Sequence, residues 1–282
     1  MFTFGTLYFS HFFYRMNNYV AIVFFFTLII HLIATLAYSV RLVGIQTGRL
    51  AVSFALFNIL VLVSRFSNSI QAPILAKWIE KDMSTGNIAA VGSNFHWLIL
   101  AATIGTLLGA FLIPTFQRIF ISIVKKFNTQ RSVPKLLIHG FSKAGVKRIK
   151  EDFTVPTKQN IKHFKDLQKI PRKLLLLNML VVGILTVGSF AAIYAGLMNP
   201  DLRLTSGYLA PVITGFATIS LVVLIDPFFS LMTDDVIEGK CSESYFRKCV
   251  AFMVGSRFMG TLLAQLFLFP AAKIIVFIAK LI

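Results

Sequence analysis

The stretch RLAVSFALFNILVLVSRFSNSIQAP, residues 49–73, decides the fold class, because it is long enough to cross a bilayer and is apolar along most of its length. Polar side chains interrupt it, and at about 100° per residue they fall within roughly 160° of a helix surface. They are Asn58, Ser64, Arg65, Asn68 and Gln71. The pattern predicts a membrane-spanning helix with one polar face.

Arg65 lies near the middle of this stretch. An arginine at the centre of a lone spanning helix costs about 2.5 to 3.5 kcal/mol on insertion scales, so such a residue normally faces protein or water. Two interpretations are open. The side chain either makes a structural pair or reaches a lipid headgroup, or it holds an anion.

The composition indicates an all-α polytopic membrane protein. Of the 282 residues, 56% are hydrophobic and 14% charged, and the mean hydropathy is +0.77, which no soluble domain of this size requires. The net charge is +17, and the basic residues are concentrated beside apolar spans. This arrangement indicates that the basic residues bind an anionic membrane surface and not a nucleic acid. Cys241 and Cys249 have no CxxC spacing, so we expect no metal site, disulfide or cofactor.

Six apolar stretches are expected to cross the membrane as helices. They lie at about 19–38, 49–73, 94–114, 174–197, 208–232 and 250–269. The last twelve residues would extend only about 18 Å as a helix, so we expect them to continue or flank the sixth span. Residues 1–16 lack a basic start and a small-residue cleavage site, so we expect no secretory signal, and Met16 is an alternative start.

A basic loop separates two halves of the chain. Residues 118–173 contain fifteen Lys or Arg against three acidic residues, and such loops stay in the cytoplasm. The loop contains two Pro-bounded amphipathic pieces, 134–150 and 157–170, which we expect to anchor in the headgroup layer or to bind anionic lipids or a partner. The expected division is a first three-helix half at 1–116, the loop at 117–173 and a second three-helix half at 174–282.

Ionisable side chains also lie inside other spans. His31 in the first span is either a packing residue or a proton carrier. Asp226 lies in the fifth span and Arg257 in the sixth. Together with Arg65, the spans are therefore expected to contain one buried aspartate and two buried arginines that can contact each other. Asp226 is then the counter-ion of an arginine, a proton site or a plain structural ion pair.

A faint internal repeat relates the two halves. GTLLGAFLIP at 105–114 resembles GTLLAQLFLFP at 260–270, and VLVSRF in the second span is loosely answered by VVLIDPF in the fifth. Either two Leu-rich helices are alike by chance, or the halves form an inverted repeat, superposable about an axis in the membrane plane. In inverted-repeat transporters the substrate site lies near the midplane, between the halves.

The run AYSVRLVGIQTGRLAVSFALFNILVLVSRFSNSIQAP, residues 37–73, resembles the signature of the Amj family of alternate lipid II flippases. The residues that carry the likeness are Tyr38, Arg41, Gly44, Thr47, Arg49, Asn58, Ser64, Arg65, Asn68, Gln71 and Pro73. The resemblance extends over the basic loop and the six spans; the first 16 residues depart from it. It implies transport of undecaprenyl-pyrophosphate-linked disaccharide-pentapeptide from the inner to the outer leaflet of the bacterial cytoplasmic membrane, without covalent chemistry.

Charge and position supply the candidate substrate-binding residues. A lipid pyrophosphate needs cations within the low-dielectric core, and a guanidinium binds phosphate through two hydrogen bonds. Arg65 and Arg257 are the main candidates, and Arg65→Lys is expected to impair transport because it keeps the charge but loses the two-point contact. The other candidates are Arg41, Arg49, Asn58, Ser64, Asn68, Gln71 and Gln265 for the substrate, with Asp226 and His31 as counter-ion or proton sites.

Other functions remain open from the sequence. A membrane polyprenyl-pyrophosphate phosphatase would need a nucleophile with an acid/base pair, or an acidic metal site. The predicted spans contain one acid, and His31 and His96 have no triad-like companions in sequence. Buried polar residues are also consistent with a channel for a substrate other than lipid, or with a scaffold. A homo-oligomer is also possible. The sequence has no GxxxxGK[ST] motif, so ions, potential or the substrate gradient would supply the energy.

The basic loop predicts an orientation that labelling can test. With the loop inside, both termini lie outside. In intact cells, Ala144→Cys in a background without the two native cysteines should resist a membrane-impermeant maleimide and react after permeabilisation. Labelling of position 144 in intact cells would contradict the orientation.

Overall fold

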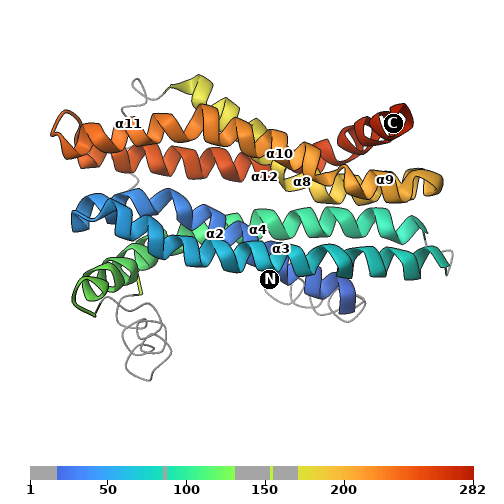
Figure 1. Ribbon diagram of the computed structural model, residues 1–282, viewed down its shortest axis with the longest axis horizontal. Coiled ribbons are helices and arrows are strands. Elements are labelled where there is room, and N and C mark those ends of the chain that lie inside the picture. The colour runs from blue at the N-terminus through green and yellow to red at the C-terminus, as the bar shows by residue number, and fades with distance from the viewer. Residues whose placement is uncertain (1–17, 85–87, 131–152, 155–170) are drawn as a thin grey trace, which may run out of the picture.

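The computed structural model describes residues 18–84, 88–130, 153–154 and 171–282, and it shows long helices lying side by side (Figure 1). The described segments contain no strand. In chain order they are α2 (Asn18–Thr47), α3 (Leu50–Ser84), α4 (Ile88–Gln130), α8 (Arg172–Met198), η3 (Pro200–Leu202), α9 (Arg203–Tyr208), α10 (Ala210–Ser220), η4 (Leu221–Ile225), α11 (Asp226–Ile237) and α12 (Glu243–Leu281). Six of the described segments are long and apolar enough to cross a membrane, which confirms the expected six spans.

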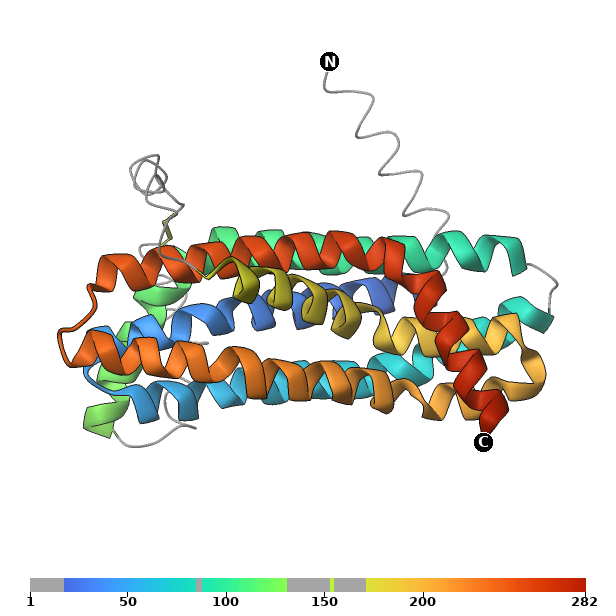
Figure 2. The ribbon, with the colours of Figure 1, turned by 90° about the horizontal axis from the view of Figure 1, so that it is seen from above.

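Several helices are longer than the sequence predicted. Helix α4 passes through Pro114 and continues to Gln130, beyond position 117 where the loop was expected to begin. Its continuation is apolar at helical spacing, and Phe120 and Val124 pack in a core cluster with residues of α2 and α3, so packing compensates for the hydrogen bond that the proline removes. The last twelve residues continue α12, which contains Pro270 and bends in its C-terminal part (Figure 2). Residues 1–16 and both amphipathic pieces of the loop lie outside the described residues.

The fifth span is irregular, whereas the sequence predicted one helix at 208–232. The chain from Pro200 to Ile237 passes through a 3₁₀ turn, two α-helical pieces, a π-helical segment at 221–225 and a third α-helical piece. The first turn of the third piece contains Pro227, and proline lacks the backbone N–H that a regular helix would use there. Such π segments are common at functional sites, and this one directly precedes Asp226.

The helices form two layers, one from each half of the chain (Figure 1). In the first half α2 packs against both α3 and α4, and in the second half α8 packs against both α10 and α12. The layers meet chiefly through α4 and α12. An inverted repeat would give each half this same arrangement, but the two-fold relation itself stays a prediction.

The two GTLL segments make equivalent close contacts. A Cβ at Gly105 would overlap the carbonyl oxygen of Leu28 on α2, and a Cβ at Gly260 would lie 2.5 Å from the carbonyl oxygen of Met179 on α8. Each glycine therefore lets the third helix of its half touch the backbone of the first, as small residues do in membrane helix pairs.

The bundle has an inner and an outer end, named here from the predicted orientation. The inner end carries the turns at Gly48 and Gly239, which take positive φ angles of 65° and 75° and so favour glycine. Toward the outer end the halves are joined by an aromatic cluster. Phe95 of α4 lies 5.8 Å from Trp78, 6.3 Å from Phe190 and 5.4 Å from Tyr194, measured between ring centroids.

The close glycine contacts predict a stability difference. Gly260→Val and Gly105→Val should lower the thermal unfolding midpoint of the detergent-solubilised protein, because overpacking costs about 1–3 kcal/mol. Gly255→Val is the matched control on α12, since a Cβ there meets nothing within 4 Å. Equal midpoints for Gly260→Val and Gly255→Val would contradict the packing described.

Candidate functional site

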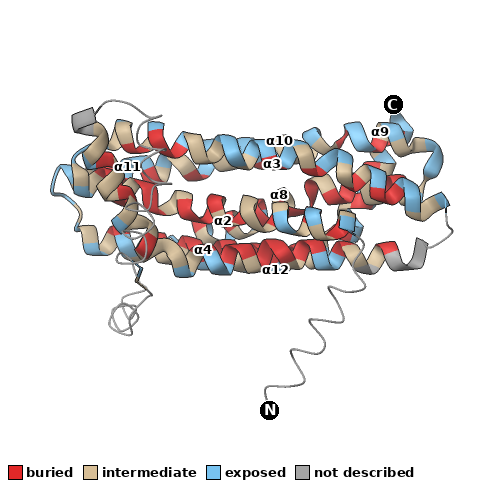
Figure 3. Cartoon of the chain, turned by 90° about the horizontal axis from the view of Figure 1, so that it is seen from below, coloured by how far each residue is buried: buried red, intermediate tan, exposed pale blue. Residues whose placement is uncertain are grey.

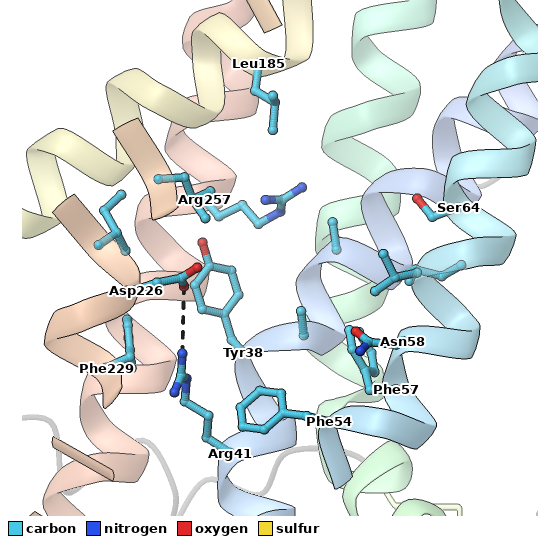
Figure 4. A pocket seen from close by; sticks show the side chains of 16 residues that line it. Tyr38, Arg41, Phe54, Phe57, Asn58, Ser64, Leu185, Asp226, Phe229 and Arg257 are labelled. Carbon is cyan, nitrogen blue, oxygen red and sulfur yellow. Dashed lines mark ion pairs between the residues drawn. The ribbon is translucent and has the colours of Figure 1, made fainter. Parts of the chain in front are cut away.

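A cavity of about 360 Å³ lies between the two halves (Figure 4). Helices α2 and α3 line it from the first half, and α8, η4, α11 and α12 line it from the second. Its polar lining consists of Tyr38, Arg41, Asn58, Ser64, Asp226 and Arg257. We call it the inner cavity. Its size is at the lower end of the range for small-ligand sites, and apolar side chains make up the rest of its wall.

Arg257 projects from α12 into the inner cavity (Figure 4). The residue is 3% exposed, and its Nε has no hydrogen-bond partner in the described part of the chain. Its Nη2 lies 3.4 Å from Nδ1 of His31. No described carboxylate forms an ion pair with it. A buried guanidinium without a counter-charge is strongly destabilising, so this position favours an anion.

His31 is the buried neighbour of Arg257 on α2. An arginine only donates hydrogen bonds, so the contact requires a lone pair on Nδ1 of the imidazole. As the acceptor of a hydrogen bond from Arg257, His31 would be neutral and would carry its proton on Nε2. Its predicted role as a proton site stays a prediction.

Arg41 provides a second guanidinium and connects the two halves. Its Nη2 lies 3.8 Å from Oδ1 of Asp226, its Nη1 donates to Oγ of Ser230 at 3.1 Å, and its Cζ lies 5.1 Å from the ring centroid of Phe54. The sequence suggested Arg65 or Arg257 as the partner of Asp226, but the structure pairs Asp226 with Arg41. The Asp226 side chain is 46% exposed, so water or another anion can compete for Arg41.

A buried hydrogen-bond network fixes the helices around Arg257. Tyr38 donates its hydroxyl to Oδ1 of Asn178 at 2.9 Å, and Nδ2 of Asn178 donates to the Met253 carbonyl and to Oγ of Ser256, both at 3.2 Å. The network ties α2 to α8 and α12, and a fully satisfied buried network is rigid. Asn178 is not among the residues predicted from the sequence, although an asparagine inside LLLLNMLVV is a detectable signal.

The other predicted residues occupy several environments. Asn58 and Ser64 line the inner cavity, whereas Arg49 is exposed at the inner end outside it. Gln71 is buried on α3. Oε1 of Gln265 lies 2.7 Å from Nδ1 of His96 on α4, and Nε2 of Gln265 donates to the His96 carbonyl at 3.0 Å.

Arg65 and Asn68 are exposed on α3 and lie outside the lining of the inner cavity. The expected burial of Arg65 is therefore not observed. The physical reason is that α3 packs mainly against α2 and α4 on one side, which leaves the opposite side of the helix uncovered. Among the described residues, no group of three His, Cys, Asp or Glu could hold a metal ion.

Similarity to known proteins covers the whole site. The model of the Amj family, described as "Alternate to MurJ", matches residues 26–279. The chain belongs to the Amj family. The Lipid II flippase Amj of Bacillus subtilis (strain 168) is 39% identical over 262 residues, which are 93% of this chain and 97% of that relative. No solved structure matches the chain.

Membership of the Amj family confirms the resemblance inferred from residues 37–73. The match includes every residue that lines the inner cavity. It also confirms the expectation of a multi-pass membrane transporter that is not an enzyme.

Proposed function

We propose that this protein moves lipid II from the inner to the outer leaflet of the bacterial cytoplasmic membrane, and that the lipid pyrophosphate binds in the inner cavity. The observation that carries the proposal is the buried guanidinium of Arg257, which faces the cavity without a carboxylate partner among the described residues. The flippase name of the relative from Bacillus subtilis supports the choice of substrate.

Two guanidinium groups from opposite halves suit a pyrophosphate. Arg257 comes from α12 and Arg41 from α2, and both line the same cavity. A guanidinium binds a phosphate through two parallel hydrogen bonds, and apolar walls lower the local dielectric constant and strengthen the attraction. A ligand held by both arginines is held by both halves, so movement of one half against the other changes its environment.

Asp226 serves as the resting counter-ion of Arg41 in this proposal. The ion pair is long at 3.8 Å and partly exposed, so an incoming phosphate can replace the carboxylate. Arg41 lies six residues before the end of α2, about 9 Å from the inner end of the helix. The Arg41 end of the cavity is therefore close to the leaflet from which the substrate starts.

Substitution of Arg257 tests the pyrophosphate site. In proteoliposomes with fluorescent lipid II, Arg257→Gln should slow flipping by about tenfold or more, because a hydrogen bond to a charged group contributes about 1.5–3 kcal/mol. Arg257→Lys should also be impaired, because it keeps the charge and loses the two-point contact. Arg118→Gln is the matched control, since Arg118 is exposed on α4 outside the cavity.

Membrane abundance and thermal midpoint are measured for each variant, so that a folding defect is recognised. Normal flipping by Arg257→Gln at normal abundance would overturn the pyrophosphate site. Absence of flipping by the unaltered protein would overturn the proposed function itself.

A further inference from the structure

A second cavity of about 500 Å³ lies toward the outer end, and we call it the outer cavity. It is flanked by α3 and the fifth span, as the inner cavity is. Its polar lining is Glu80, Asp201, Arg203 and Tyr208. Nη2 of Arg203 lies 3.5 Å from Oε1 of Glu80, so this ion pair connects the two halves at the outer end.

One face of α3 runs from the inner cavity to the outer one. At about 100° per residue, the lining residues Asn58 and Glu80 and the exposed residues Arg65 and Asn68 between them fall within roughly 120° of the helix surface. Asn58 and Glu80 are 22 residues apart, about 33 Å along a helix. That length matches a hydrocarbon core of about 30 Å.

The opposing surface belongs to the fifth span. Helix α10 lies in the layer opposite α3, and the two overlie each other when the molecule is seen from above or below (Figures 1, 2 and 3). Helix α10 packs on α8 and leaves Val212, Phe216 and Ile219 at least half exposed. The fifth span runs antiparallel to α3, with Asp226 at the inner cavity and Arg203 at the outer one.

The polar side chains on this face require a polar environment. An arginine facing lipid at this depth costs about 2.5 to 3.5 kcal/mol, so the face of α3 with Arg65 and Asn68 is stabilised by water or by a ligand. Positive charge occurs at each stage, as Arg257 in the inner cavity, Arg65 between the cavities and Arg203 in the outer one. An anionic headgroup complements this series, and a lipid tail can stay in the bilayer only if the path is open at the side.

We propose that α3 and the fifth span form a side-open groove that carries the pyrophosphate headgroup of a polyprenyl lipid from the inner to the outer cavity. Arg65 contacts the phosphate between the two cavities, and Arg203 receives it in the outer cavity when the headgroup displaces Glu80. The proposal rests on the proposed function, because it assumes that this lipid is the substrate.

Thiol accessibility tests the groove. Ala72→Cys lies on the groove face of α3, and Val63→Cys lies about 180° away on the helix. Both are exposed, and they lie five and four residues from the midpoint of α3 at position 67, so their depths are matched. In a background without native cysteines, a water-soluble anionic methanethiosulfonate should modify Ala72→Cys in proteoliposomes and leave Val63→Cys unmodified.

Modification of Ala72→Cys should also slow the flipping of fluorescent lipid II, and excess unlabelled lipid II should protect the thiol. An unreactive Ala72→Cys, equal reactivity of Val63→Cys, or normal flipping after modification would overturn the groove. If the unaltered protein flips lipid II but the Ala72 adduct has no effect, the groove fails and the proposed function stands. If the unaltered protein flips no lipid II, the proposed function fails, and the groove as a path for this lipid fails with it. The thiol reactivity then still shows whether this face of α3 is exposed to water.

Discussion

The positive charge of Arg257, buried between the two halves, is the constraint on which the site depends. The residue is 3% exposed, its Nη2 lies 3.4 Å from Nδ1 of His31, and no described carboxylate forms an ion pair with it. A buried charge without a partner lowers the stability of the folded protein. A bound ligand of opposite charge would restore that stability. The surrounding helices hold the guanidinium in place through the hydrogen bonds of Tyr38 and Asn178.

Each half of the protein packs more closely within itself than against the other half. Glycine contacts at Gly105 and Gly260 hold the third helix of each half against the first. Contacts between the halves are fewer and include the ion pair of Arg41 with Asp226 and that of Arg203 with Glu80. Partly exposed ion pairs of this kind contribute little to stability, so under the proposed mechanism a phosphate would replace the carboxylate of each pair while both halves stay intact.

The sequence predicted the spans well because length and hydropathy determine them locally. It also drew attention to Asp226 and Arg257, which line the inner cavity, because an ionisable residue in an apolar span is informative by itself. The pairing of Arg41 with Asp226 joins positions 185 residues apart, and no local pattern reports such a contact. The exposure of Arg65 depends on which face of α3 its neighbours cover, and the irregular fifth span depends on the prolines that interrupt an otherwise apolar run.

The central claim is that a lipid pyrophosphate binds between the halves at Arg257. The most direct measurement is a cryo-electron microscopy structure of the protein in nanodiscs with undecaprenyl pyrophosphate. We expect density for the pyrophosphate in the inner cavity, with phosphate oxygens about 2.7–2.9 Å from the guanidinium nitrogens of Arg257. Pyrophosphate density only outside the inner cavity, with Arg257 contacting protein groups alone, would contradict the claim.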